Sequence, residues 1–145
     1  MLYYISGKEI IMNEVTEFLK KNSVQFLATL GLDGKPKVRP FQYMLENGGK
    51  LYFCTGNTKD VYNEMVKQPY IEVSCSAEDF SWIRLKGKVI FTGDPAIKKE
   101  IIEASPLVKS IYKTPDNPQF EVFFIDEAEA TISDFSGNPP RSFKL

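Results

Sequence analysis

The segment VQFLATLGLDGKPKVRPFQYML, residues 24–45, is the most informative part of the sequence because it predicts two antiparallel strands joined by a short turn. Over residues 24–30 the even-numbered side chains are apolar, whereas Gln25 and Thr29 lie on the opposite face, an alternation typical of a strand. Asp33-Gly34 is a strong signal for a hairpin turn. Residues 37–45 then predict the returning strand.

Outward from this hairpin, the chain alternates predicted strands with short helices. Asn47-Gly48 gives a second turn, so residues 50–54 extend the hairpin into a three-stranded antiparallel meander. Gly87 marks a bend or bulge within a long strand. Further strands are predicted over 72–76, 82–92, 121–125 and 128–134, helices over 13–21 (capped by Asn13), 58–67, 95–104 (capped by Asp94) and 107–112, and an irregular tail over 137–145. Six or seven strands linked by tight turns favour a mainly β fold, an antiparallel β-barrel with short helices.

The composition restricts the class of protein. The 145 residues suffice for one domain, and 18 basic against 19 acidic residues give a net charge of -1. This balance argues against a protein that binds nucleic acid or a membrane surface, because such proteins usually have an excess of basic residues. No segment is apolar enough to cross a bilayer, and the N-terminus lacks the pattern of a signal peptide, so we expect a cytoplasmic protein.

The chain contains no histidine and only two cysteines, Cys54 and Cys75. The lack of histidine excludes Ser-His-Asp and Cys-His catalysis and removes the commonest transition-metal ligand. Each cysteine lies in an apolar, strand-like segment, which indicates two reduced, buried thiols rather than a disulfide or redox pair. We therefore expect no metal site.

Thr55-Gly56-Asn57-Thr58-Lys59 connects a predicted strand to a predicted helix and is the first candidate for a ligand site. The backbone N–H groups and the dipole at a helix start favour an anion, and the hydroxyl and ammonium groups of this segment add donors. Asn57 or Thr58 is expected to cap the helix. The same segment also fits an ordinary capped connection without a ligand.

Arg39-Pro40-Phe41-Gln42, within the second strand, is the next candidate. Pro40 cannot donate to a β-ladder, so the strand is either an edge or distorted there, and its free backbone groups could meet a ligand. Arg39 carries a planar, permanent charge suited to phosphate, and it shares its face with Lys35 and Lys37. Alternatively, Pro40 protects an edge against aggregation and the basic side chains are simply solvated.

Trp82, Arg84 and Lys86 share one face of a later strand, opposite Ile83 and Leu85. An aromatic ring with two cations can pack on a ring system or on a partner chain. An amphipathic strand with a half-buried tryptophan explains the pattern equally well.

The runs FLATLGLDGKPKVRPFQY and KLYFCTGNTKDVYNEMVKQPYIEV, followed by WIRLKGKVIFTGD and AEATISDFSG, resemble the pyridoxamine 5'-phosphate oxidase-like superfamily of split β-barrels that bind flavin mononucleotide (FMN). Within it, the chain is most similar to small proteins related to the nitroimidazole-resistance (Nim) group. The resemblance implies a split-barrel domain over residues 13–145, preceded by an N-terminal extension over 1–12 that either precedes an internal start or adds a strand.

The resemblance further implies a homodimer with FMN at the subunit interface. The residues that would bind the cofactor fall into four groups. Arg39, Pro40, Phe41 and Gln42 line the flavin, and Arg39 also lies near the phosphate, which it would hold together with the Thr55–Lys59 segment. Cys54 and Thr55 lie beside the ribityl chain and the phosphate. Thr58 and Lys59 hold the phosphate, and Trp82 lies at the flavin edge or in the opposite subunit's site.

The activity that follows is an FMN-dependent oxidoreductase acting on a small molecule, with no catalytic residue assigned, because Tyr43, Thr55 or water could supply protons. Oxidation of pyridoxamine phosphate itself is not expected, since the chain lacks the family's late histidine and Arg141 is its only late arginine. A flavin carrier or sensor without turnover is the alternative. A third possibility is an interaction or nucleic-acid-binding barrel, which the near-neutral charge disfavours. Haem, which related barrels bind, would need a tyrosine or cysteine ligand here.

Overall fold

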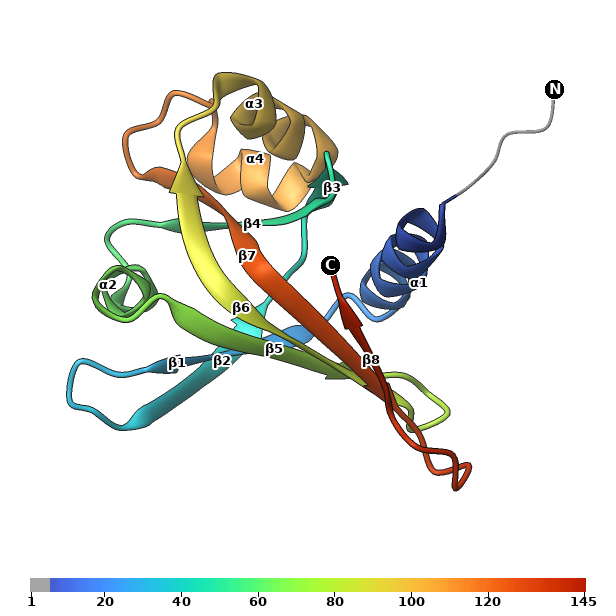
Figure 1. Cartoon of the computed structure of the whole chain (residues 1–145). Coiled ribbons are helices and arrows are strands. Elements are labelled where there is room, and N and C mark those ends of the chain that lie inside the picture. Colours follow the sequence, from blue (N-terminus) through green and yellow to red (C-terminus); the bar gives the residue numbers. More distant parts are fainter. Residues whose placement is uncertain (1–5) are drawn as a thin grey trace, which may run out of the picture.

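The computed structural model describes residues 6–145, which form one eight-stranded antiparallel sheet and four helices (Figure 1). The strands run in the order β2-β1-β5-β6-β7-β4-β3, and β8 pairs with β7. The strands are β1 Gln25–Leu30, β2 Pro36–Phe41, β3 Leu45–Asn47, β4 Lys50–Gly56, β5 Tyr70–Ser76, β6 Trp82–Thr92, β7 Phe120–Ser133 and β8 Arg141–Lys144. The helices are α1 Gly7–Lys21, α2 Asp60–Lys67, α3 Pro95–Ala104 and α4 Pro106–Tyr112. Because β2 and β3 end this order, the sheet is a barrel left open on one side, which confirms the expected mainly β, split-barrel architecture.

The β1–β2 hairpin forms as predicted, and β2 is an edge strand, as Pro40 indicated. The three-stranded meander is wrong, because β4 pairs with β3 and β7 instead of β2. The chain leaves the sheet after Phe41, where the Tyr43 N–H donates to the side chain of Gln25 at 2.6 Å. The turn after Asn47 then closes a separate β3–β4 hairpin, with Gly48 and Gly49 at φ +60° and +81°.

The two late strands predicted over 121–125 and 128–134 are one long strand, β7. The β6–β7 register shifts between Lys86 and Lys88, and Glu127 has a φ of +52°. A side chain on Gly87 would lie 2.4 Å from Ile125 Cγ2 and 2.5 Å from the Asp126 carbonyl oxygen, so only glycine fits opposite this bulge. The bulge expected at Gly87 is therefore confirmed, and it interrupts the alternation of β7 enough to suggest two strands.

The helices and the C-terminal tail correct further expectations. The first helix begins at Gly7, because Ser6 and Glu9 form a capping box upstream of Asn13. The second begins at Asp60 and α4 begins at Pro106, one residue before its predicted start, whereas α3 matches its predicted bounds and is capped by Asp94. The tail is not irregular throughout, because β8 pairs with residues 129–132 of β7. Residues 1–5 of the expected extension lie outside the described residues. None of the helices from residue 6 onward is long and apolar enough to span a membrane.

The sheet buries two separate apolar clusters. The larger one fills the barrel, where α1 and α2 contribute Val15, Leu19, Val61 and Met65. The smaller one lies between the opposite face of β4 and β7 and the α3–α4 pair, which covers the upper end of the barrel in Figure 1. Strand β4 therefore separates two environments, and its alternate side chains point into one or the other.

Candidate functional site

The connection from β4 to α2 is the first predicted site, and its helix start is open. Lys59 precedes the first turn of α2, and no side chain among residues 6–145 caps it. The expected cap Asn57 instead donates to the Pro118 carbonyl at 2.7 Å and to the Glu121 carboxylate at 3.0 Å. Thr58 and Lys59 are exposed beside this uncapped end. The arrangement leaves N–H groups, a hydroxyl and an ammonium available to an anion.

Thr55 precedes this connection and is 2% exposed. Its Oγ1 is buried and has no hydrogen-bond partner within the described residues. A buried hydroxyl without a partner lowers stability, so it is retained where it serves another purpose. The next residue, Gly56, lets the backbone of β4 lie close to the side chain of Tyr112, because a Cβ there would lie 2.9 Å from the Tyr112 hydroxyl.

Arg39 points from β2 into the barrel toward α2. Its Nη1 donates to the Leu27 carbonyl at 3.2 Å and to Thr29 Oγ1 at 2.7 Å, and its Nη2 lies 2.5 Å from Glu64 Oε1. Thr29 Oγ1 also donates to Glu64 Oε1 at 2.8 Å. The predicted guanidinium therefore does approach the helix that follows Lys59, but it is already paired with a carboxylate of that helix.

Glu64 is the residue that the sequence reasoning missed. It is 4% exposed and lies on the apolar side of α2 with Val61 and Met65. A carboxylate on the buried face of a helix needs a cationic partner. The signal in the sequence was that Glu64 lies three residues after Val61 and next to Met65, on the apolar face of the predicted helix.

The other residues of the 39–42 run point in different directions. Pro40 lies on the outer face of the edge strand, opposite Phe26. Phe41 faces inward, with its ring centroid 6.3 Å from Phe53 and 6.0 Å from Phe123. Gln42 is exposed just beyond the end of β2. Within one chain, these residues share an edge of the sheet rather than a single surface.

Cys54 and Thr55 are neighbours on β4 and therefore point to opposite faces. Cys54 packs against the α3–α4 cluster, and burial raises the pKa of its thiol to about 12, although Lys59 opposes the shift. Burial likewise raises the pKa of Cys75 to about 11. Both cysteines are free, so they are present as protonated thiols at neutral pH.

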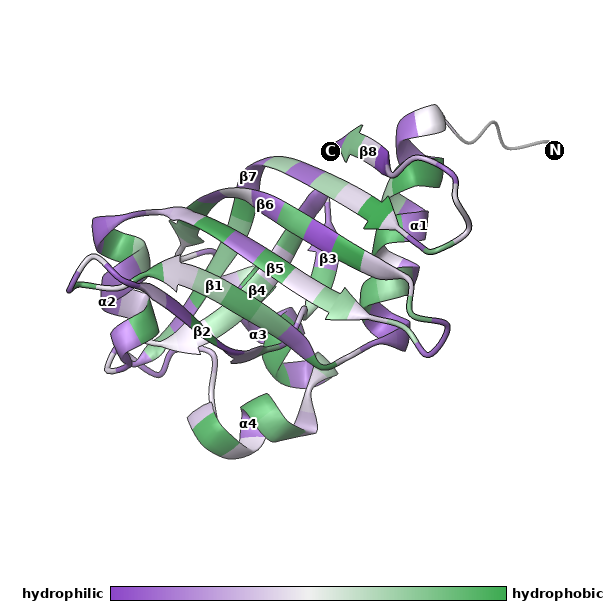
Figure 2. Ribbon diagram, turned by 90° about the horizontal axis from the view of Figure 1, so that it is seen from below, coloured by the Kyte–Doolittle hydropathy of each residue, from purple (hydrophilic) through white to green (hydrophobic). Residues whose placement is uncertain are grey.

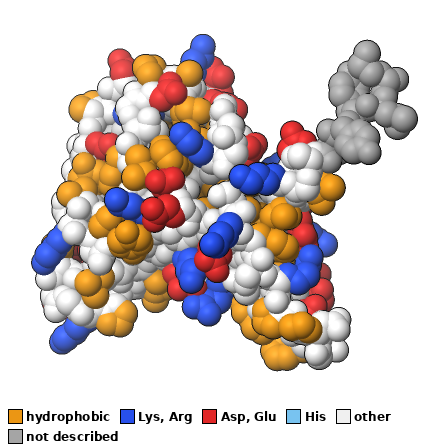
Figure 3. All heavy atoms as spheres, in the orientation of Figure 1, with side chains coloured by type: hydrophobic (Ala, Val, Ile, Leu, Met, Phe, Trp, Pro, Cys, Tyr) orange, Lys and Arg blue, Asp and Glu red, His pale blue; other side chains and the backbone are white. Residues whose placement is uncertain are grey.

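Trp82 begins β6, at the end of that strand remote from α2 (Figure 1). It pairs with Ser133, whereas Gly56 pairs with Phe120 near the other end of β7. Its ring lies 5.3 Å from that of Phe135, which is 80% exposed. Figure 3 shows hydrophobic side chains grouped at this lower tip of the molecule. One chain alone does not bring Trp82 to the α2 end.

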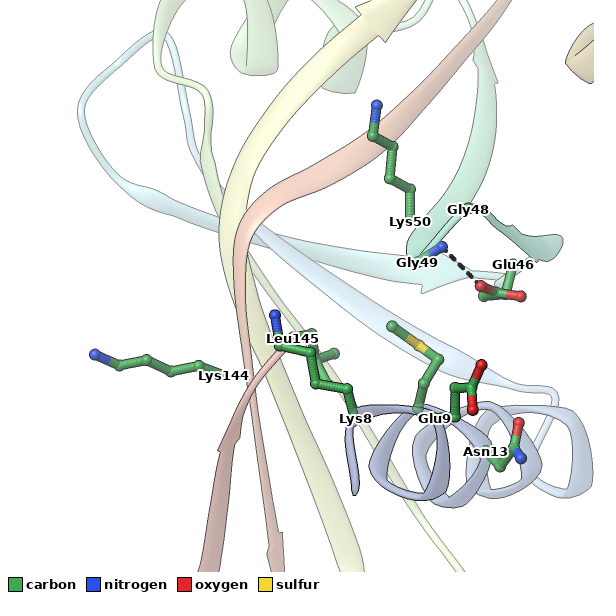
Figure 4. Close-up of a pocket in the computed structure, with 10 residues that line it drawn as sticks. Lys8, Glu9, Asn13, Glu46, Gly48, Gly49, Lys50, Lys144 and Leu145 are labelled. Carbon is green, nitrogen blue, oxygen red and sulfur yellow. Dashed lines mark hydrogen bonds between the residues drawn. The ribbon is translucent and has the colours of Figure 1, made fainter. Parts of the chain in front are cut away.

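Two surface cavities formed by residues 6–145 are not lined by any of the nine predicted cofactor residues. The larger, about 980 Å³, lies between α1, the β3–β4 turn and the C-terminus. Its lysines do not converge, since Lys50 and Lys144 point away from each other (Figure 4). The smaller, about 460 Å³, lies over β5 and β6 beside Glu127.

An open antiparallel barrel with an anion-compatible strand-to-helix connection is the class of protein that these observations define. The family described as pyridoxamine 5'-phosphate oxidase matches residues 11–133. The chain belongs to this family, which confirms the resemblance seen in the sequence. No curated protein matches the chain.

Solved structures extend this result. A NimC/NimA family protein from Clostridium acetobutylicum is 36% identical with a TM-score of 0.85, and the match covers 92% of each chain. A pyridoxamine 5'-phosphate oxidase-related, FMN-binding protein from Nostoc punctiforme is 15% identical (TM-score 0.71; 97% of this chain, 91% of that one). A heme-binding protein from Mycobacterium smegmatis is 19% identical (TM-score 0.71; 99% of this chain, 60% of that one). The last two show a shared fold alone.

Proposed function

We propose that the chain binds FMN and acts as an FMN-dependent oxidoreductase on a small molecule. The observation that carries this proposal is the β4–α2 connection, where a buried unpaired hydroxyl on Thr55, an uncapped helix start and Lys59 follow one another. These groups fit a phosphoester better than any ligand without an anion. Family membership and the FMN binding of the Nostoc relative support the choice of FMN.

In this proposal, Thr58, Lys59 and the N–H groups at the start of α2 hold the phosphate. Thr55 lies next to the ribityl chain, and the open edge of β2 from Arg39 to Gln42 lines the ring. Pro40 supplies no N–H there, so the flavin's polar rim would meet the donors and acceptors of its neighbours. Cys54 contributes through packing, because its thiol points toward α3 and α4.

The outer face of the β1–β2 hairpin supports a homodimer. Phe26, Leu30 and Val38 are exposed on it, with Val38 67% exposed, and Ala28 pairs with Val38 between them. Figure 2 shows β2, β1 and β5 side by side on the face turned to the viewer. A continuous apolar strip on a sheet is typical of a protein–protein interface. In this proposal a second copy covers the strip, and Trp82 contributes to the partner's site, as the resemblance implies.

Bound FMN would supply the hydride chemistry, and the chain would supply binding and orientation. Tyr43 is 6% exposed, and burial raises its pKa to about 12, so it stays protonated at neutral pH. The chain has no histidine, and its two thiols are protonated, so neither an imidazole nor a thiolate is available as a proton carrier. Hydride transfer itself needs neither group, and a flavin carrier or sensor is the second candidate.

The absorbance spectrum of the purified protein, with mass identification of any released chromophore, tests the cofactor directly. Flavin bands and a released mass equal to FMN are expected. A Soret band would instead indicate haem, and a colourless protein that FMN does not bind would contradict the proposal.

Lys59→Ala tests the phosphate site. A charge-assisted hydrogen bond from the ammonium to the phosphate is worth roughly 1.5–3 kcal/mol, so FMN affinity should fall about tenfold or more while the fold is retained. Lys99→Ala, in an exposed pair with Glu103 on α3, is the matched control and should leave the affinity unchanged. Equal affinities of the two variants would show that the phosphate lies elsewhere.

Stopped-flow reduction with nicotinamide donors, followed by a screen of acceptors, separates the enzyme from the carrier. Reduction of the flavin by a donor, followed by its reoxidation by an acceptor, supports the oxidoreductase proposal. A flavin that stays oxidised with every donor supports the carrier proposal.

A further inference from the structure

Three polar side chains from three elements meet inside the barrel beside α2. Arg39 of β2 and Thr29 of β1 both bind the same oxygen, Oε1 of Glu64, at 2.5 and 2.8 Å. Thr29 Oγ1 also accepts from Arg39 Nη1 at 2.7 Å, so each of the three contacts the other two. The network is the polar link between the β1–β2 hairpin and the helix.

The position of Glu64 on α2 places this link near the start of the helix. A helical side chain leans toward the N-terminus of its helix, so Glu64 lies over the turn that begins at Asp60. That turn is the uncapped one beside Lys59. The hairpin therefore contacts the helix close to the end that would meet a phosphate.

The charges of the network also restrict what Arg39 can do. Its guanidinium is paired with a carboxylate that is 4% exposed, and a buried carboxylate without its cation would be left uncompensated. Lys59 is exposed and makes no ion pair among the described residues. The free cation next to the helix start is thus Lys59, and Arg39 is committed to Glu64.

We propose that Glu64 is a positioning residue for the phosphate end of the cofactor site. Through Arg39 and Thr29 it fixes the first turn of α2 against the β1–β2 hairpin. Arg39 acts as the link between strand and helix, while Lys59 and the helix N–H groups meet the phosphate. The proposal rests on the proposed FMN site.

Riboflavin provides the probe, because it has the ring and ribityl chain of FMN but no phosphate. Dissociation constants for both flavins are measured by fluorescence titration of the wild type and of Glu64→Gln, Thr29→Val and Arg39→Met. Glu103→Gln, an exposed glutamate on α3, is the control. The readout is the ratio of the riboflavin constant to the FMN constant, which a general loss of stability would leave unchanged.

Glu64→Gln should lower this ratio about tenfold, because the helix start shifts while the ring site remains. Arg39→Met should lower the ratio by a similar factor. The double variant that combines Glu64→Gln and Arg39→Met should lower it by no more than either single variant, since both substitutions remove the same contact between strand and helix. Thr29→Val, which removes one of two donors to the carboxylate, should give a smaller decrease in the same direction and decides the matter if Glu64→Gln fails to fold.

A ratio that rises or stays constant in Glu64→Gln but falls in Arg39→Met would overturn the inference, because Arg39 would then bind the phosphate itself and Glu64 would compete with it. Additive decreases in the double variant would overturn it as well. A wild-type protein that binds FMN no better than riboflavin would instead remove the proposed phosphate site, a different result from a site that exists but ignores Glu64.

Discussion

The two faces of the β1–β2 hairpin differ in their side chains, because the inner face combines apolar residues that pack in the core, Leu27 and Phe41, with polar ones, whereas the outer face is apolar and exposed. The inner face carries Gln25, Thr29 and Arg39, and all three are tied into hydrogen bonds. The outer face carries Phe26 and Val38, which are exposed. Apolar side chains usually face the core and polar ones the solvent, so each face here has a specific reason for its composition.

The two faces also differ in where their side chains find contacts. The inner polar groups find partners within the chain, since Gln25 alone accepts from the Tyr43 N–H and donates to the Leu19 and Asn22 carbonyls. The outer apolar groups have none of comparable extent among the described residues. The hairpin thus connects α1 and α2 on its inner side, and its outer side is the face that we propose to meet a second copy of the chain.

Gln25→Met tests the inner face and should have the largest effect. The side chain is fully buried, and its removal leaves an N–H and two carbonyls without partners, which should lower the free energy of unfolding by about 3 kcal/mol. Urea denaturation followed by circular dichroism measures the change. Gln119→Met, at an exposed position, should change it little. Equal stabilities would mean that the inner network is dispensable.

Val38→Glu tests the outer face. A charge at the centre of an apolar interface should weaken the proposed dimer by about 2 kcal/mol, roughly thirtyfold in its dissociation constant. Sedimentation equilibrium reports the constant, and FMN affinity should fall with it. Val66→Glu, on the exposed side of α2, is the control. A wild type that is monomeric at micromolar concentration would refute the assignment of this face.

Thr55→Val contrasts the paired polar groups of the inner face with an unpaired one. Removing its hydroxyl should raise the free energy of unfolding of the flavin-free protein by up to about 1 kcal/mol and should weaken FMN binding. Thr16→Val removes a buried hydroxyl that does have a partner, the Asn13 carbonyl, and should lower stability instead. Thermal melts and FMN titration measure both. A Thr55→Val protein that is less stable would mean that this hydroxyl has a partner after all.

The sequence predicted most elements of the fold, because the signals for them are local. Asp94-Pro95 starts α3, Asp33-Gly34 turns the first hairpin, and Pro40 marks an edge. The misplaced parts depend on contacts between distant residues. The 42–44 segment leaves the sheet because Tyr43 binds Gln25, and β8 exists because β7 offers it an edge. No local pattern contains either pairing.

The candidate site was predictable to a smaller degree. The β4–α2 connection followed from a glycine and donors at a strand-to-helix junction. The partner of Arg39 did not, because Glu64 is 25 residues away and becomes its neighbour only when α2 packs on the barrel. Within one chain Trp82 lies at the end of β6 remote from α2, so its assignment to a cofactor site remains a prediction of the proposed dimer.

The bulge at Glu127 determines which side chains in the rest of β7 point into the barrel. Before it, Phe123 and Ile125 point into the barrel; after it, Ala128, Ala130 and Ile132 do so, which moves the inward positions from odd to even numbers. Because the bulge is one extra residue opposite Gly87, its deletion would restore a regular ladder and leave these later side chains pointing inward. A deletion elsewhere in β7 would instead reverse every side chain between the deletion and the bulge or the strand end. The chain's tolerance for changes in length along this strand is therefore decided at a single residue.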